Sequence, residues 1–291
     1  MKRFLLLLLV AMMCLTLCSC DTLLKKAKTA VTGVEESKMP EDYLTSAEND
    51  DFSYDVYKEY IKVTKYIAEE GDGAVTVPSS IEGKPVKVIG SLCFHDTEVK
   101  VTSVKIPSSV ETIEESAFYY ADKLESIRIP DSVTSIGSRA FAWCNSLKTI
   151  SFGSGVTEIP SYCFNHCESL ETVIIPSKIT KIGVRAFSYC NSIKEFTVPS
   201  NVSELHERAF DGCASLEFLF INNPEIVIGD YILDGCDKAV VISADDTNAK
   251  RYCAEKGIRW STSKDVPAII ITPDESSVEA EASDTEASKS N

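Results

Sequence analysis

The sequence predicts an α/β repeat solenoid, with one short parallel β-strand per 23-residue coil, short helical or 3₁₀ turns, and a cap at each end. Three residue types recur in phase at this interval: a phenylalanine, a cysteine and a proline. The repeating positions are Phe118, Phe141, Phe164, Phe187 and Phe210, then Cys144, Cys167, Cys190, Cys213 and Cys236, then Pro107, Pro130, Pro176 and Pro199. A constant period of about 20–30 residues is typical of stacked repeats, in which each unit covers the apolar face of the next.

One coil contains a strand followed by turns. Ile127 and Ile129 flank the polar Arg128, and successive side chains of a strand point to opposite faces. The isoleucines therefore face the core and Arg128 faces outward. Pro130 ends the strand because it has no backbone N–H to donate to a neighbouring coil. Phe141 begins the predicted helical or 3₁₀ turn, and its ring fills the core.

The N-terminus has the pattern of an export signal. Two basic residues precede an apolar run at 4–17, which is shorter than the roughly 20 residues that a membrane-spanning helix needs. The run ends in Leu17-Cys18-Ser19-Cys20, which resembles a bacterial lipobox. The resemblance implies cleavage before Cys20 and lipidation of that cysteine, which would anchor the protein to a membrane outside the cytoplasm. Ordinary signal cleavage, leaving a freely secreted protein, is the alternative.

Breaks in the periodicity divide the chain into six segments. We expect a lipoprotein signal peptide at 1–19, the lipidated cysteine and a tether at 20–51, N-terminal cap strands at 52–76, about seven repeat coils at 77–244, a cap helix and strand at 245–262, and an acidic disordered tail at 263–291. The cap helix is predicted from Thr247 to a glycine stop at Gly257.

The repeat resembles the BspA-like, or treponemal-type, leucine-rich repeats of bacterial surface proteins. The matching pattern, within residues 106–221, is Ile-Pro-x-x-Val-x-x-Ile-x-x-x-Ala-Phe-x-x-Cys-x-x-Leu-x-x-Ile, and the resemblance covers roughly residues 52 to 260. It departs at Gly153, where a proline is expected, and at the insertion 82–85. The resemblance implies an exported, surface-attached protein that is used for adhesion or for binding host, microbial or matrix macromolecules.

Composition and motifs argue against other functions. The net charge of −15 does not suit a nucleic-acid partner, which needs a basic stripe. The chain has only three histidines, and no Ser-His-Asp order, glycine-rich phosphate loop or paired-carboxylate motif stands out. We therefore expect a protein that is not an enzyme and that holds no cofactor.

The cysteines in the repeats are better explained as packed core residues than as disulfide or metal-binding residues. A buried free cysteine behaves as a small hydrophobic residue, and parallel side chains in a column seldom meet disulfide geometry. A core ladder is therefore favoured over disulfides or a metal site. Cys163, His166 and Cys167 resemble a zinc half-site, but no second half-site is visible and we predict no metal.

The outward strand positions are candidates for ligand binding because they change from coil to coil. The candidates are Lys105, Arg128, Ile174, Phe218 and Phe220. Exposed aromatic residues on a rigid sheet are plausible binding hot spots. Cover of Phe218 and Phe220 by the C-terminal helix is the favoured alternative.

A second candidate stripe lies one residue before the cysteine column. Tyr120, Trp143, His166 and Tyr189 share the 23-residue spacing, and Gly212 follows them. We expect these rings to stack along one edge, where they could bind a protein or glycan, or shield the turn from water. The sequence thus favours a membrane-anchored lipoprotein that binds an extracellular or envelope macromolecule. The alternative is a structural component of the cell envelope without an external ligand.

Overall fold

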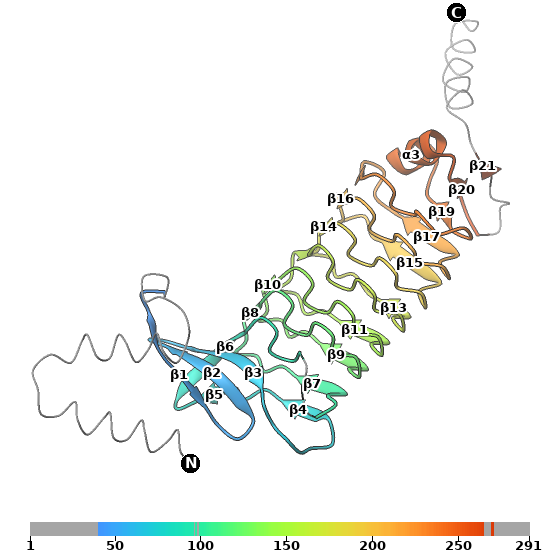
Figure 1. Cartoon of the computed structure of the whole chain (residues 1–291). Coiled ribbons are helices and arrows are strands. Elements are labelled where there is room, and N and C mark those ends of the chain that lie inside the picture. The colour runs from blue at the N-terminus through green and yellow to red at the C-terminus, as the bar shows by residue number, and fades with distance from the viewer. Residues whose placement is uncertain (1–39, 96, 98, 265–268, 271–291) are drawn as a thin grey trace, which may run out of the picture.

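The computed structural model describes residues 40–95, 97, 99–264 and 269–270. It is an elongated solenoid of about nine turns, with the first turns at one end and helix α3 (Asn248–Lys256) at the other (Figure 1). The predicted solenoid with a repeating unit of about 23 residues is confirmed, but most coils have a short parallel strand on two sides, where the sequence predicts one strand per coil. The predicted signal peptide, Cys20 and the end of the acidic tail lie outside the described residues.

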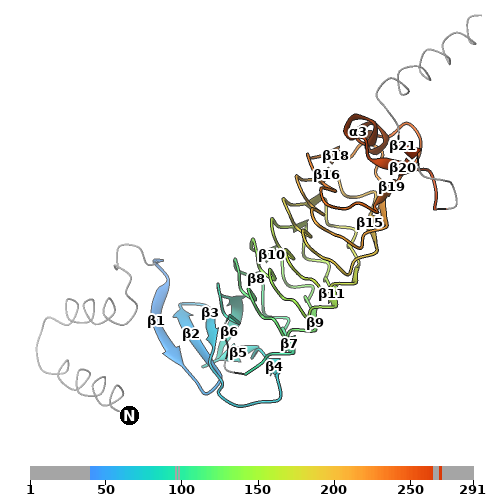
Figure 2. The same cartoon turned by 45° about the vertical axis from the view of Figure 1, so that its right-hand side comes forward.

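One long side of the solenoid, here called the strand face, is a column of parallel strands (Figure 2). Its members are β4 (Ala74–Thr76), β7 (Ser103–Lys105), β9 (Ser126–Arg128), β11 (Thr149–Ser151), β13 (Thr172–Val173), β15 (Glu195–Val198), β17 (Phe218–Ile221), β19 (Val240–Ile242) and β20 (Arg259–Ser261). The antiparallel β21 (Ile269–Ile270) follows β20. Alternating burial along β9 puts Ile127 in the core and Arg128 in solvent, as the sequence predicts.

A second column of strands runs beside the first. Its members are β5 (Ser80–Ile81), β6 (Lys84–Ile89), β8 (Thr112–Ile113), β10 (Ser135–Ile136), β12 (Glu158–Ile159), β14 (Lys181–Ile182), β16 (Glu204–Leu205) and β18 (Val227–Ile228). Its ladder stops between β10 and β12. The amides of Gly137 and Gly183 donate to the preceding coil at 2.8 Å, but Pro160 occupies the same position and has no amide to donate.

The N-terminal cap starts earlier in the chain than the sequence predicts. β1 (Tyr43–Glu48), β2 (Phe52–Tyr57) and β3 (Ile61–Tyr66) form an antiparallel unit, and β3 pairs in parallel with β6. The prediction that the tether continues to residue 51 is therefore wrong, since β1 is a strand. β4, predicted as a cap strand, pairs with β7 and is the first rung of the strand face.

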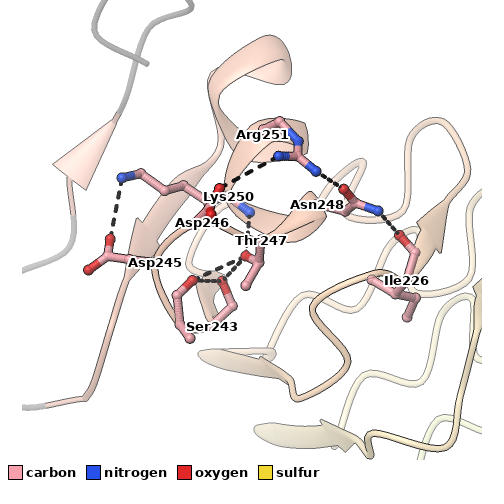
Figure 3. A network of polar contacts seen from close by, with 9 residues as sticks. Ile226, Ser243, Asp245, Asp246, Thr247, Asn248, Lys250 and Arg251 are labelled. Atoms are coloured by element: carbon pink, nitrogen blue, oxygen red, sulfur yellow. Dashed lines mark hydrogen bonds and ion pairs between the residues drawn. The ribbon is translucent and has the colours of Figure 1, made fainter. Parts of the chain in front are cut away.

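The C-terminal cap is the predicted helix. Thr247 caps α3 by accepting a hydrogen bond from the Lys250 amide at 3.2 Å, and Gly257 ends the helix in the left-handed conformation. Asn248 donates to the Ile226 carbonyl at 3.2 Å and accepts from Arg251, which ties the helix to the last coil (Figure 3).

The phenylalanine column forms the centre of the core. Neighbouring rings from Phe94 to Phe210 stack at centroid distances of 4.7 to 5.5 Å, and each is almost fully buried. The predicted helical or 3₁₀ turns around Phe141 are instead tight turns with left-handed residues at two positions per coil, such as Arg139 and Trp143. Within the described repeats, no α-helix interrupts this pattern before α3.

The cysteine column lies beside the phenylalanines and links successive coils. Each thiol donates to the carbonyl of a phenylalanine 26 residues earlier, as in the 3.1 Å contact from Cys167 Sγ to Phe141 O. The described cysteines are free and buried. Burial raises the pKa of the Cys167 thiol far above its ordinary value, so the uncharged thiol is the form that the fold accommodates. The cysteine column is therefore part of the hydrophobic core.

Candidate interaction surfaces

The outward residues of the strand face keep a common register along the solenoid. Lys105 pairs with Arg128, and Arg128 pairs with Ser151, in successive parallel strands. All three side chains point outward, and Lys105 and Arg128 are exposed, as predicted. The face therefore presents a different side chain at each rung on a backbone that hardly changes.

This face is interrupted once, between β13 and β15. β13 ends one sheet and β15 begins another, and no backbone hydrogen bond joins residues 171–175 to residues 194–198. On either side the ladder is intact, with the Glu171 amide 3.0 Å from the Lys148 carbonyl and the Glu217 amide 2.7 Å from the Lys194 carbonyl. The two facing strands are thus edge strands in the middle of the molecule.

A larger core side chain accounts for the interruption. Phe196 stands in the inward column where the neighbouring coils have Val173 and Leu219. Its buried ring packs between Phe187 and Phe210, at centroid distances of 4.9 and 4.7 Å. A ring needs more space than a valine or leucine, and a packed core meets that demand by moving the backbone.

The interruption forms an open groove of about 960 Å³ on the strand face. Its lining includes both edge segments, from Glu171 to Ile175 and from Lys194 to Pro199. Ile174 lies on its border and is 76% exposed, the most exposed of the large apolar residues among those described. One predicted binding residue therefore coincides with a groove that the repeat pattern does not predict.

Phe218 and Phe220 are half-buried on β17, and the helical cover that the sequence favours is wrong. Helix α3 packs against β18 and β20 at the end of the solenoid (Figure 1). The ammonium of Lys264 lies over both rings, 5.1 and 5.3 Å from their centroids, and pairs with Glu195 at 2.5 Å. A lysine from the segment after β20 therefore covers part of this aromatic pair.

The four ring-bearing residues of the second stripe do stack. Tyr120 and Trp143 lie 5.1 Å apart, Trp143 and His166 3.9 Å, and His166 and Tyr189 4.5 Å, with ring planes within 3 to 11° of parallel. The column ends at Gly212, where a Cβ atom would lie 2.6 Å from the Tyr189 ring. We call this set the aromatic column.

The stack uses the ring faces for contact among the rings themselves. Tyr120 and Tyr189 at the two ends are 43% and 39% exposed, while Trp143 and His166 between them are half-buried. Burial lowers the pKa of His166, and Glu168 at 4.0 Å opposes this shift. Since the inner ring faces are covered, a ligand can meet mainly ring edges there.

Comparison with known proteins identifies the repeat type. Residues 87–217 match the model of the BspA type leucine rich repeat region in six copies. Over these residues the repeats are of the BspA type. No curated protein is significantly similar to the chain.

Solved structures with similar folds come from bacterial leucine-rich repeat proteins. One from Eubacterium ventriosum is 28% identical with a TM-score of 0.56, covering 65% of this chain and 49% of its own. The chain thus spans about half the length of that protein. The T. pallidum leucine-rich repeat protein is 23% identical with a TM-score of 0.49, covering 75% of this chain and 98% of its own. A leucine-rich cell surface protein from Faecalibacterium prausnitzii is 18% identical, with a TM-score of 0.39, covering 74% and 88%.

The BspA-type turns separate the three residues of the zinc-like motif. Cys163 and Cys167 point into the core, whereas His166 belongs to the aromatic column. Throughout the described ranges, no group of three or more His, Cys, Asp and Glu side chains is arranged to hold a metal ion. In the same ranges, no helix has the length and apolarity required to cross a membrane.

Repeat periodicity alone misses three residues that shape these surfaces. Pro160 and Phe196 each occupy a repeat position with an unusual residue type, so comparing columns could have revealed them. Lys264 lies beyond the BspA-type repeats, and no periodic signal marks its contact with Phe218 and Phe220.

Proposed function

We propose that this chain is a bacterial cell-surface lipoprotein, anchored through Cys20, whose strand face binds an extracellular or envelope protein or glycan without catalysis. One observation carries the proposal: outward residues vary from Lys105 and Arg128 to Ile174 on a backbone of nearly constant register. Solenoids commonly bind macromolecules through such extended faces, because each rung offers an independent side chain. The BspA-type repeats and the lipobox pattern support a surface location.

The strand face is a better binding surface than the aromatic column. Binding hot spots bury apolar or aromatic surface that is free before association. Ile174 is 76% exposed, whereas the faces of Trp143 and His166 already contact neighbouring rings at 3.9 Å. The aromatic column therefore contributes mainly to the packing of the turns.

A binding array with matched variants tests this assignment. The full chain is applied to immobilised, purified matrix proteins, mucins and bacterial envelope proteins. We expect saturable binding to at least one of them, reduced at least about tenfold, or about 1.4 kcal/mol, by the double variant Lys105→Glu/Arg128→Glu or by Ile174→Asp. Val227→Asp is the control, since Val227 is 66% exposed but lies on the other strand column. The assignment would be wrong if the double variant Tyr120→Ser/Trp143→Ser lost binding while the strand-face variants kept it. Such a result would place the binding site on the aromatic column.

The anchor is tested separately. Cys20→Ala should abolish incorporation of a labelled fatty acid and release the protein from the membrane fraction, because stable anchoring requires about two acyl chains or equivalent signals. Cys18→Ala is the matched control and should leave both properties unchanged. Membrane association that survives Cys20→Ala would contradict the lipoprotein assignment.

A further inference from the structure

The outer surface of the strand face becomes apolar at its C-terminal end, where β15, β17, β19 and β20 lie side by side (Figure 1). Phe218 and Phe220 point outward on β17, and their register partners on β19 are Val240 and Ile242. The corresponding positions on β15 and on most earlier strands are polar. Contiguous apolar side chains on the outside of a sheet mark a surface that other groups cover.

The chain covers part of this surface with the segment that follows β20. Ser261, at the end of β20, donates from its hydroxyl to the Ser263 carbonyl at 2.8 Å. One residue later, the ammonium of Lys264 lies back over the rings of β17. The segment 262–264 therefore crosses the outward side of β19, whose outward side chains are buried.

The Lys264 ammonium occupies a site made by three side chains. It lies 5.1 Å from the ring centroid of Phe218, 5.3 Å from that of Phe220 and 2.5 Å from the Glu195 carboxylate. The electron-rich faces of aromatic rings attract a cation, and the carboxylate supplies the opposite charge. The site therefore suits both the charge and the apolar stem of a lysine side chain.

The positions of these three side chains are set by the strands and not by Lys264. Glu195 is the register partner of Phe218, and Thr197 is that of Phe220, in the parallel pairing of β15 with β17. This backbone ladder holds the carboxylate beside the rings, so the site is preorganised. Lys264 remains partly exposed, and an exposed ion pair is weak. Another ammonium can therefore replace it.

We propose that Glu195, Phe218 and Phe220 bind a lysine side chain of a partner protein, and that Lys264 occupies this site in the unbound chain. The inference rests on the proposed function and narrows its partner to a protein with an accessible lysine. The net charge of −15 favours the approach of a basic segment. A neutral glycan has no cation that can replace Lys264. Lys264 is thus an intramolecular competitor that lowers the affinity for the partner.

Frontal chromatography of the full chain on immobilised lysine, with the ε-ammonium free, tests this site. Immobilised acetyl-lysine, which has no charge, shows how much of the retention depends on the ammonium. Lys264→Ala should bind lysine up to about fivefold more tightly than the wild type, the change that corresponds to about 1 kcal/mol. Equal affinities of Lys264→Ala and the wild type overturn the proposal.

Substitutions in the site identify its components. In the Lys264→Ala background, Glu195→Gln and Phe218→Ala should each weaken lysine binding about fivefold, because each removes one group that contacts the ammonium. Glu125→Gln is the matched control, since it removes the same charge from a similarly exposed pair with Lys148, outside this site. A loss in Glu195→Gln no greater than that in Glu125→Gln also overturns the proposal.

Acetylation of the lysines of a bound array protein separates this inference from the proposed function. Acetylation removes the charge of a lysine, so it should weaken binding to the full chain about fivefold. If array binding depends on Lys105 and Arg128 but is unchanged by acetylation, the proposed function stands and the lysine site is wrong. If immobilised lysine binds as expected but no array protein does, the lysine site stands and the proposed function is wrong.

Discussion

The turn side and the strand face of the solenoid have the same 23-residue period but differ in continuity. On the turn side, backbone hydrogen bonds connect every coil from Tyr120 to Gly212, and two stacks of rings follow them, one inside and one outside. On the strand face, the ladder is interrupted between β13 and β15, and the outward residues share no common type.

This difference shows which side of the coil determines stability. In a solenoid each coil is stabilised by its contacts with its neighbours, and here the buried phenylalanine and cysteine columns lie on the turn side. The strand face can then change residues, or open altogether, without separating the coils.

Removing a ring from the core side of the turns should cost the most stability. Phe164 is fully buried between Phe141 and Phe187, at 5.5 and 5.3 Å. Phe164→Ala leaves a cavity and should lower the free energy of unfolding by about 3–5 kcal/mol, measured by urea denaturation. Phe220→Ala, on the strand face, is the control and should cost about 1 kcal/mol. Equal losses would contradict the comparison.

Alkaline pH should lower the stability of the folded state by ionising the buried cysteines. Burial raises the pKa of the Cys167 thiol above its ordinary value, and raises the pKa of the Cys253 thiol to about 12. A raised folded-state pKa means that the fold favours the protonated thiol, so this contribution is complete below about pH 9 and is lost as the pH rises through the folded-state value.

The thermal midpoint should therefore fall steadily as the pH rises from about 9 to 12. In Cys167→Ala the drop between these pH values should be smaller than in the wild type, although the variant starts from a lower midpoint at pH 7. The exposed-site variant Thr149→Ala is the control and should show the wild-type slope. An unchanged slope in Cys167→Ala would show that the thiols do not govern the alkaline transition.

The aromatic column allows ring stacking to be separated from backbone strain. Trp143 has a φ of 65°, a left-handed conformation that costs a non-glycine residue about 1–2 kcal/mol. Trp143→Ala removes the stacking of this ring on Tyr120 and His166 but keeps the strain of the left-handed backbone. Trp143→Gly removes both the stacking and the strain. We expect both variants to be destabilised, with the glycine variant about 1 kcal/mol more stable than the alanine variant in urea denaturation.

The matched pair Ser126→Ala and Ser126→Gly should show the opposite order. Ser126 lies in β9, where the extended conformation offers glycine no advantage and its flexibility costs about 0.5–1 kcal/mol. If glycine is worse than alanine at position 143 too, the left-handed turn is not a source of strain.

The sequence predicts the regular parts of this molecule and misses its exceptions, for physical reasons. Inward positions repeat because every coil must fill the same space, so Phe141 and Cys167 were recognisable as core. The turns were predicted as helical or 3₁₀ segments, but they contain left-handed residues, a conformation that usually favours glycine. Gly212 has the residue type that this conformation favours, whereas Trp143 and Tyr189 adopt it with large side chains, so the residue types do not reveal the turn.

The sequence predicts which candidate side chains point outward, but not the groove or the cover that surrounds them. Outward orientation follows from alternation, so Arg128 and Ile174 were placed correctly. The groove depends on how the backbone responds to the ring of Phe196, and the cover over Phe218 depends on Lys264. The unusual ring at position 196 can be recognised by comparing repeat columns, but the backbone shift that follows and the position of Lys264 cannot be read from the period.

The smallest expected effect concerns the partial cover over the strand face. Lys264 pairs with Glu195 at 2.5 Å and lies over Phe218 and Phe220, but its side chain is 41% exposed. An ion pair this exposed contributes at most about 1 kcal/mol, so Lys264→Ala should change the free energy of unfolding by less than that. Hydrogen exchange in β17 should nevertheless become faster, because the rings lose their cover, while Lys105→Ala leaves it unchanged. A large loss of stability in Lys264→Ala would mean that the strand face helps to hold the coils together, and the contrast with the turn side would disappear.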